Sequence, residues 1–263
     1  GGQLSPGATL TADGSVRLNG AAVALAALEG VSSGLVSLNG TALQLGAGTF
    51  AGVLADGAAT GSLQKVGAGL LTLSGMNTFS GTVTVSGGSL ALAAGSLATS
   101  AVAVGSAGSL TVASGATLNE AATLSLDGTV YFGASAVTLA TLNGASTGLA
   151  QLAGTALTLS GGSFQGVVAD AGAVGSLMKV GADTLTLGGA NTFSGSLTVG
   201  GGMLVLGGTG SLATNLLSVV SGGTLEVAAG ATLSSAAALT ADGLVNFNAN
   251  LALQSLIGTG SVS

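Results

Sequence analysis

The chain has 263 residues and a formal net charge of −6, and its 49 glycines disfavour long regular helices. Charged residues make up 5%, against about 25% in a typical soluble domain, but the hydrophobic fraction of 48% indicates a chain that buries a core rather than a disordered one. The absence of His and Cys excludes Ser-His and Cys-His nucleophiles, imidazole or thiolate metal sites and disulfides, and the three basic residues are too few to neutralise a nucleic-acid backbone.

The first candidate element, Ala21–Leu28 (AAVALAAL), is rich in Ala, which is also compatible with a helix. Its counterparts later in the chain are Ser135–Leu142 (SAVTLATL) and Leu251–Leu256 (LALQSL). Thr at the aligned positions favours a strand. We therefore predict strands in these segments.

Two five-residue segments, Gly30–Gly34 (GVSSG) and Gly144–Gly148 (GASTG), match the G-x-S-x-G pattern of a hydrolase nucleophile elbow. A nucleophilic serine normally requires a histidine base, and the chain has none. Both segments also lie at the 114-residue offset that relates other repeated segments. We interpret them as turns that recur with the fold.

Short segments with alternating apolar residues recur from Leu70 onward, separated by Gly-rich turn sequences, and predict strands. In both halves of the chain, each segment has an equivalent one coil later along the sequence. Such a period predicts an all-β fold, a right-handed parallel β-helix with about 19–21 residues per coil, about 13 coils and a length of about 60 Å. The predicted inward positions are Leu71, Leu73, Val83, Val85, Leu90, Leu92, Val102, Val104, Leu110 and Val112.

A longer repeat is nested over these coils. The segment Gly67–Leu92 returns as Gly181–Leu206, an offset of 114 residues, with 17 of 26 positions identical. This predicts long repeats at approximately 8–115 and 116–230 and a partial copy at 231–263, within one continuous domain over residues 1–263. Asp-Gly steps recur with the copies and are typical of turns; they begin at Asp13, Asp127 and Asp242.

The longest step between strands contains an aromatic residue in each copy. We place Phe79 one coil before Leu97, and Phe193 one coil before Leu212. These residues would form a third apolar corner, which predicts a triangular cross-section.

The nine carboxylates lack the spacing of a catalytic pair or a calcium site, because no two neighbouring ones are separated by the length of one coil. Asp56 precedes Lys65 by nine residues, and Asp170 precedes Lys179 by the same nine, so each pair could meet across a turn. An exposed pair of this kind would contribute only about 0–1 kcal/mol. We interpret these groups as structural.

The segments Gly67–Leu92 and Gly181–Leu206, with the preceding Lys65 and Lys179, resemble the passenger-associated transport repeat of autotransporter proteins. The shared pattern is a Lys, alternating Gly and Leu, an Asn-x-aromatic-x-Gly corner, a Thr/Val strand, and Gly-Gly followed by Leu-x-Leu. The positions that carry this structural motif are Lys65, Gly67, Gly75, Asn77, Phe79, Gly81, Gly87, Gly88, Lys179, Gly181, Gly189, Asn191, Phe193, Gly195, Gly201 and Gly202.

Two features of the NTFSG corner bear on its role. Asn77 and Asn191 carry side-chain amides that can cap backbone groups of a turn, so we interpret them as structural rather than ligand-binding. Phe79 and Phe193 stand where Tyr is commoner in the repeat, a change that leaves the coil intact.

The resemblance implies a passenger segment of a type V secretion system, a β-helix carried through the Gram-negative outer membrane by a C-terminal barrel. The chain looks like the middle of a larger passenger, so membrane contact is expected only through a barrel that is absent from these residues. The implied location is extracellular or on the Gram-negative outer-membrane surface.

We expect a non-enzymatic β-helical segment that acts as a rigid stalk in adhesion or aggregation, with no cofactor, no metal ion and no nucleic-acid partner. Its ligand on a host or bacterial surface is unknown from the sequence. One alternative is an extracellular filament or sheath protein that self-associates end to end or side by side. Another is the scaffold of a larger toxin or enzyme whose active domain is absent here.

Overall fold

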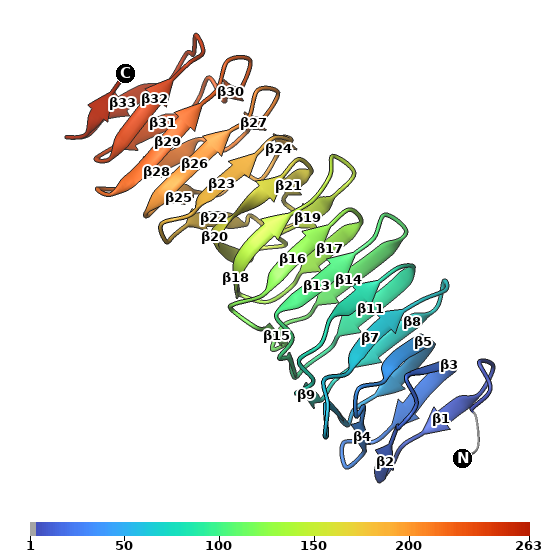
Figure 1. Cartoon of the computed structure of the whole chain (residues 1–263). Helices are drawn as coiled ribbons and strands as arrows, with labels where there is room; N and C mark the ends of the chain where they lie inside the picture. Colours follow the sequence, from blue (N-terminus) through green and yellow to red (C-terminus); the bar gives the residue numbers. More distant parts are fainter. Residues whose placement is uncertain (1–3) are drawn as a thin grey trace. The chain divides into compact units, whose positions relative to one another are not determined.

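The structure is a computed structural model that describes residues 4–263. Parallel strands stack as a β-solenoid of about 13 turns with about 20 residues per turn, and no helix occurs among the described residues (Figure 1). The predicted all-β fold of parallel coils is therefore confirmed. The chain divides into two compact units, Gly1–Ala134 and Ser135–Ser263, and the single continuous domain remains a prediction.

The first unit contains three stacks of parallel strands, and β3 and β5 each contribute their first half to stack 3 and their second half to stack 1. Stack 1 consists of β1 (Thr9–Thr11), β3 (Ala22–Gly30), β5 (Ala42–Phe50), β8 (Leu70–Leu73), β11 (Gly88–Leu92), β14 (Gly108–Val112) and β17 (Thr129–Phe132). Stack 2 consists of β2 (Ser15–Arg17), β4 (Leu35–Ser37), β6 (Val53–Ala55), β9 (Met76–Asn77), β12 (Ser96–Leu97) and β15 (Thr117–Leu118). Stack 3 adds β7 (Ser62–Lys65), β10 (Val83–Val85), β13 (Ala101–Val104) and β16 (Thr123–Leu126).

The second unit repeats this arrangement, with β18 and β20 each divided between two stacks. Stack 1 consists of β18 (Ala136–Asn143), β20 (Ala156–Phe164), β23 (Thr184–Leu187), β26 (Gly202–Leu206), β29 (Gly223–Val227), β32 (Leu244–Phe247) and β34 (Ser261–Val262). Stack 2 consists of β19 (Leu149–Gln151), β21 (Val167–Ala169), β24 (Ala190–Asn191), β27 (Ser211–Leu212) and β30 (Thr232–Leu233). Stack 3 adds β22 (Ser176–Lys179), β25 (Leu197–Val199), β28 (Leu216–Val219), β31 (Ala238–Ala241) and β33 (Ser255–Ile257).

Period-two alternation places one set of side chains inside the coils and the other outside. Leu90 pairs with Leu71 of the preceding coil and with Leu110 of the following coil, so the inner side chains form aliphatic columns. All ten predicted inward residues are buried. Removing each such side chain from water contributes about 1.5–3 kcal/mol to folding.

The Ala-rich segment forms a strand, as predicted. It lies in β3, whose residues pair with β5 from Ala22 to Gly30, and its counterpart Ser135–Leu142 lies largely in β18. The third counterpart, Leu251–Leu256, is only partly correct, because β33 begins at Ser255. The backbone N–H of Gln254 still donates to the carbonyl oxygen of Ala237 at 2.9 Å, so the chain joins the stack only at its end.

The third corner exists as stack 2, but the predicted partners within it are wrong. Leu97 pairs with Asn77, and Leu212 pairs with Asn191, two residues before the phenylalanine in each copy. Phe79 lies beyond the end of β9, where its N–H donates to the carbonyl oxygen of Leu54 at 3.3 Å. The aliphatic column therefore contains an asparagine at this level, and the phenylalanine fills the core beside it.

The segments that match G-x-S-x-G are turns, as interpreted from the sequence. Gly34 donates its N–H to the carbonyl oxygen of Val31 at 2.9 Å, and Gly148 donates to that of Ala145 at 3.0 Å. The Asp-Gly steps also connect consecutive strands. The carboxylate of Asp13 accepts the N–H of Val31 at 3.2 Å, which ties two of these turns together.

Candidate functional site

The residue of the motif that contributes the buried charge is Lys65, the last residue of β7. It stands in an inner column of stack 3, between Leu45 of the preceding coil and Val85 of the following coil, and its exposed fraction is 0%. Alternation explains this position, because Leu63 points inward and Lys65 follows two residues later. An ammonium group is thus carried into an aliphatic core.

The ammonium group of Lys65 is surrounded by three backbone carbonyl oxygens. Nζ donates to Val66 at 2.7 Å, to Gly67 at 3.0 Å and to Gly87 at 3.1 Å. A protonated lysine has three N–H donors, so all of them are used. Burial lowers the pKa of Lys65 from its ordinary value, because no carboxylate compensates for the lost water.

The second buried polar residue of the motif is Asn77 in stack 2, whose exposed fraction is 1%. Its Oδ1 accepts the N–H of Leu54 in the preceding coil at 3.0 Å. Its Nδ2 donates to the carbonyl oxygen of Gly75 at 2.9 Å and to that of Ser96 in the following coil at 3.2 Å. One side chain therefore joins three successive coils, which extends the turn-capping role expected from the sequence.

Asp56 does not pair with Lys65, contrary to the expectation from their spacing. Its carboxylate accepts the N–H of Gly61 at 2.8 Å, and the N–H and hydroxyl of Ser80 at 3.0 and 2.6 Å. Partial burial raises the pKa of Asp56, but these hydrogen bonds from Ser80 and Gly61 outweigh it, so the pKa lies below its ordinary value. The pairing fails because each charged group is already satisfied by backbone and hydroxyl groups.

The second copy of the motif makes the same hydrogen bonds. Lys179 donates to the carbonyl oxygens of Val180, Gly181 and Gly201 at 2.7, 3.2 and 3.0 Å, and its exposed fraction is 0%. Burial lowers the pKa of Lys179, and the nearby carboxylate of Asp183 opposes that effect.

Asn191 repeats the contacts of Asn77, with bonds to the N–H of Val168 at 3.0 Å and to the carbonyl oxygens of Gly189 and Ser211 at 2.8 and 3.2 Å. Asp170 accepts from Gly175 and Ser194 rather than from Lys179, so the second predicted ion pair is also wrong. Its pKa is raised by burial but lowered more strongly by those hydrogen bonds, as for Asp56.

The remaining motif positions surround these side chains. Phe79 and Phe193 are fully buried. A Cβ atom at Gly75 would lie 1.8 Å from the carbonyl oxygen of Gly52 in the preceding coil, and Gly189 has the same distance to Gly166, so only glycine fits there. The other glycines of the motif lie in turns of the coil, and several of them closely approach the backbone of a neighbouring coil; they are Gly67, Gly81, Gly87, Gly88, Gly181, Gly195, Gly201 and Gly202.

Both copies of the motif also match a known family of sequence repeats. The family model described as passenger-associated-transport-repeat matches residues 63–92 and 177–206, which contain both lysines and both asparagines. The chain therefore carries two such repeats, in agreement with the resemblance in sequence, and it is consistent with an autotransporter passenger. The comparison with curated proteins and the comparison with solved structures gave no match.

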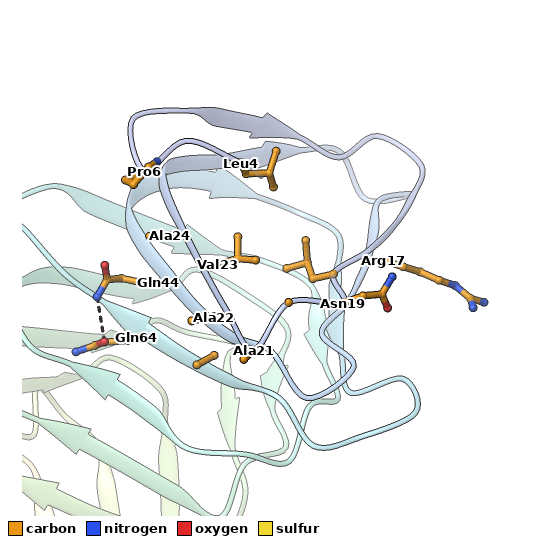
Figure 2. A pocket seen from close by; sticks show the side chains of 13 residues that line it. Leu4, Pro6, Arg17, Asn19, Ala21, Ala22, Val23, Ala24, Gln44 and Gln64 are labelled. Carbon is orange, nitrogen blue, oxygen red and sulfur yellow. Dashed lines mark hydrogen bonds between the residues drawn. The ribbon is translucent and has the colours of Figure 1, made fainter. Parts of the chain in front are cut away.

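A pocket of about 940 Å³ lies beside the first half of β3 in the first unit. Figure 2 shows Gln44 and Gln64 at one side of this pocket, Arg17 and Asn19 at the other, and Leu4, Pro6 and Val23 nearby. Nε2 of Gln44 donates to Oε1 of Gln64 at 3.1 Å. The pocket offers amides and a guanidinium to a polar ligand, but it contains no nucleophile with a base.

Gln44 and Gln64 belong to no motif of the sequence, so their role in lining this pocket was not predicted. A usable signal was present, since they occupy the same outward position of neighbouring coils. Over residues 4–263 no group of three or more acidic, His or Cys side chains could hold a metal ion. Within that same range, no helix is long and apolar enough to cross a membrane.

Proposed function

We propose that this chain is a stalk-forming β-helical segment of a secreted or surface-exposed autotransporter passenger, and that its uncharged faces contribute to adhesion or aggregation. The observation that carries the proposal is the pair of passenger repeats, each of which fastens its coil to both neighbouring coils through buried polar side chains. Such fastening stiffens a stack of coils, which is what a stalk requires. The repeat family implies a secreted or cell-surface protein.

The outer faces support the adhesive part of the proposal. On stack 3 of the first unit the outward strand residues are uncharged; they are Ala22, Ala24, Ala42, Gln44, Ser62, Gln64, Thr84, Ala101, Ala103, Thr123 and Ser125. Such a face offers repeated hydrogen-bonding groups with little like-charge repulsion, although the chain as a whole carries −6. Contact over many coils would add weak interactions.

The experiment displays the chain on a bacterial surface and measures how fast the cells settle. Placing charge on the stack 3 face with Gln44→Glu, Gln64→Glu and Thr84→Glu is expected to slow settling several-fold, because two such faces would then repel each other. The matched control places three charges on stack 1 with Thr72→Glu, Ser89→Glu and Thr111→Glu. Unchanged settling in both variants would contradict the adhesive role and leave only the stalk.

Side-by-side self-association is a second candidate, because stack 3 of the second unit is more apolar than that of the first. Met178, Leu216 and Ile257 are 43%, 60% and 64% exposed there. These side chains lie on the same outer face in different coils, and exposed apolar side chains on one face can form part of an interaction site. Sedimentation across a dilution series tests this candidate, and a monomer at all concentrations that is unaffected by Leu216→Ser would contradict it.

A further inference from the structure

Alternation alone does not fix the register of these strands. A shift of one residue turns every inner side chain outward, but a shift of two residues restores the alternation. In β13, for example, the inner residues Val102 and Val104 stack on Val83 and Val85 of β10. A two-residue slip would keep one valine on another and place the second valine opposite Gly81 or Gly87, so the aliphatic columns distinguish the two registers only in part.

Lys65 distinguishes the native register from its slipped alternative. Two of its three acceptors, Val66 and Gly67, belong to its own turn, but the third is Gly87 of the following coil. A two-residue slip of β10 would move that carbonyl by about 6.6 Å, at about 3.3 Å per residue. The ammonium group would then keep a buried N–H without an acceptor, which is strongly unfavourable.

In stack 2, Asn77 likewise distinguishes the native register from a slipped one, and it does so toward both the preceding and the following coil. It accepts from Leu54 in the preceding coil and donates to Ser96 in the following coil. A slip at either interface would remove one of these bonds while the amide stays buried. The aliphatic residues above and below Lys65 in its own column provide no such test at their level; they are Leu25, Leu45, Val85, Val104 and Leu126.

We propose that Lys65 with Asn77, and Lys179 with Asn191, form a register lock in each unit: positioning residues whose role is to select the native strand register over slipped registers that still bury part of the aliphatic columns. A buried polar group that is satisfied in only one arrangement can specify that arrangement. Each long repeat contains one coil with this pair of a buried lysine and a buried asparagine, and the neighbouring strands take their register from it. This role is distinct from the proposed stalk and adhesive function and does not depend on it.

Disulfide trapping tests the lock, because the chain contains no native cysteine. Gln64 and Thr84 are register partners on the outer face, so cysteines at both positions would be about 4.8 Å apart and report the native register. Cysteines in place of Gln64 and Thr82 would be about 8 Å apart in the native register, beyond the reach of a disulfide, and would bridge only after a two-residue slip.

Each reporter pair is placed in the otherwise unchanged chain and in the Lys65→Met, Asn77→Leu variant, and the proteins are refolded from denaturant and oxidised. We expect the slipped disulfide to be at background level in the unchanged chain and to rise about tenfold in the variant, as one lost buried charged hydrogen bond allows. Leu45→Met is the control, since it changes a neighbouring residue of the same column without touching the lock.

A slipped disulfide that stays at background in the Lys65→Met, Asn77→Leu variant would overturn the proposal, as would an equal rise in the Leu45→Met control. If the double variant does not refold, the same reporters are read in Lys65→Met alone, where Asn77 still joins the coils. A smaller rise supports the lock there, and no rise contradicts it. The second unit offers an independent repeat with cysteines at Met178 and Thr198 for the native register and at Met178 and Ser196 for the slipped one.

Discussion

The two passenger repeats make the same buried contacts, but the side chains on their outer faces differ. Lys65 and Lys179 both donate to three carbonyl oxygens, at 2.7, 3.0 and 3.1 Å in the first copy and at 2.7, 3.2 and 3.0 Å in the second. Outside the coils, Gln64 of the first unit corresponds to Met178 of the second, and Asn39 corresponds to Ala153. The comparison separates positions that the coil stack requires from positions where the two copies are free to differ.

The largest expected effect comes from removing either buried asparagine. Asn77→Ala leaves one N–H and two carbonyl oxygens without their side-chain partner, and Asn191→Ala does the same in the second unit. We expect each substitution to lower the free energy of unfolding of its unit by about 3–5 kcal/mol. Urea unfolding measures this loss, with the exposed Thr78→Ala and Thr192→Ala as controls. A loss below about 1 kcal/mol in either copy would break the equivalence of the two repeats.

A smaller effect is expected where the copies differ in a left-handed turn. Asn39 has φ +48° and Ala153 has φ +46°, a conformation that Asn tolerates better than Ala. The side chain of Asn39 also accepts the N–H of Ala58 at 2.9 Å and donates to the carbonyl oxygen of Leu18 at 3.2 Å. We expect Asn39→Ala to cost about 2 kcal/mol and Ala153→Asn to gain about 1 kcal/mol. Thermal unfolding checks both, and changes of the same sign would contradict the explanation.

Acid is expected to weaken both units alike through Asp56 and Asp170. Their pKa values in the folded chain lie below the ordinary value of 3.8, since hydrogen bonds from serine and glycine outweigh the effect of burial. The stability they contribute is therefore present above pH 3.8 and is lost as the pH falls through the lower folded pKa. Denaturant unfolding at a series of pH values measures this. Asp56→Asn with Asp170→Asn should reduce the acid dependence, and an unchanged dependence would show that other carboxylates cause it.

The smallest expected effect distinguishes the two lysines. Burial lowers the pKa of both, but the carboxylate of Asp183 raises that of Lys179. Asp183→Asn should therefore lower the pKa of Lys179 further and leave Lys65 unchanged. NMR of ¹⁵N-labelled lysine can follow both groups, because Lys65 and Lys179 are the only lysines in the sequence. Equal shifts at both sites would contradict the assignment to a local charge.

The lowered pKa values also determine how the two lysines change the stability of the fold with pH. A lysine whose folded pKa is lowered opposes folding most at pH values below that pKa, because both states are then protonated and the folded state buries the charge. Stability should rise as the pH increases from the lowered pKa towards the ordinary value of 10.5. Lys65→Met combined with Lys179→Met should remove this rise.

Much of the fold follows from local patterns in the sequence. The alternation in segments such as Ala101–Val104, together with the recurrence of equivalent segments one coil later, predicts the strands, their inner faces and their parallel stacking. The Asp-Gly and Gly-rich steps predict the turns. Register within stack 2 was missed by two residues, since β9 contains only Met76 and Asn77 and so has too little alternation to align.

The site was predictable only in part. The motif residues and the capping role of Asn77 could be inferred from the sequence, and the parity of Leu63 and Lys65 in β7 could have indicated an inward lysine. Its three acceptors could not be inferred, because they depend on how the turns at Gly67 and Gly87 orient their carbonyl groups towards one point. Spacing alone suggested an ion pair with Asp56, since it ignores the backbone groups that satisfy both charges.

Native-state hydrogen exchange read coil by coil tests most directly whether the passenger repeats fasten each unit. Buried contacts to both neighbouring coils should make the amides of residues 63–97 and 177–212 the slowest to exchange in their units, while coils without the buried lysine and asparagine open first. Exchange in the repeats that is as fast as in the other coils, or faster, would contradict that role.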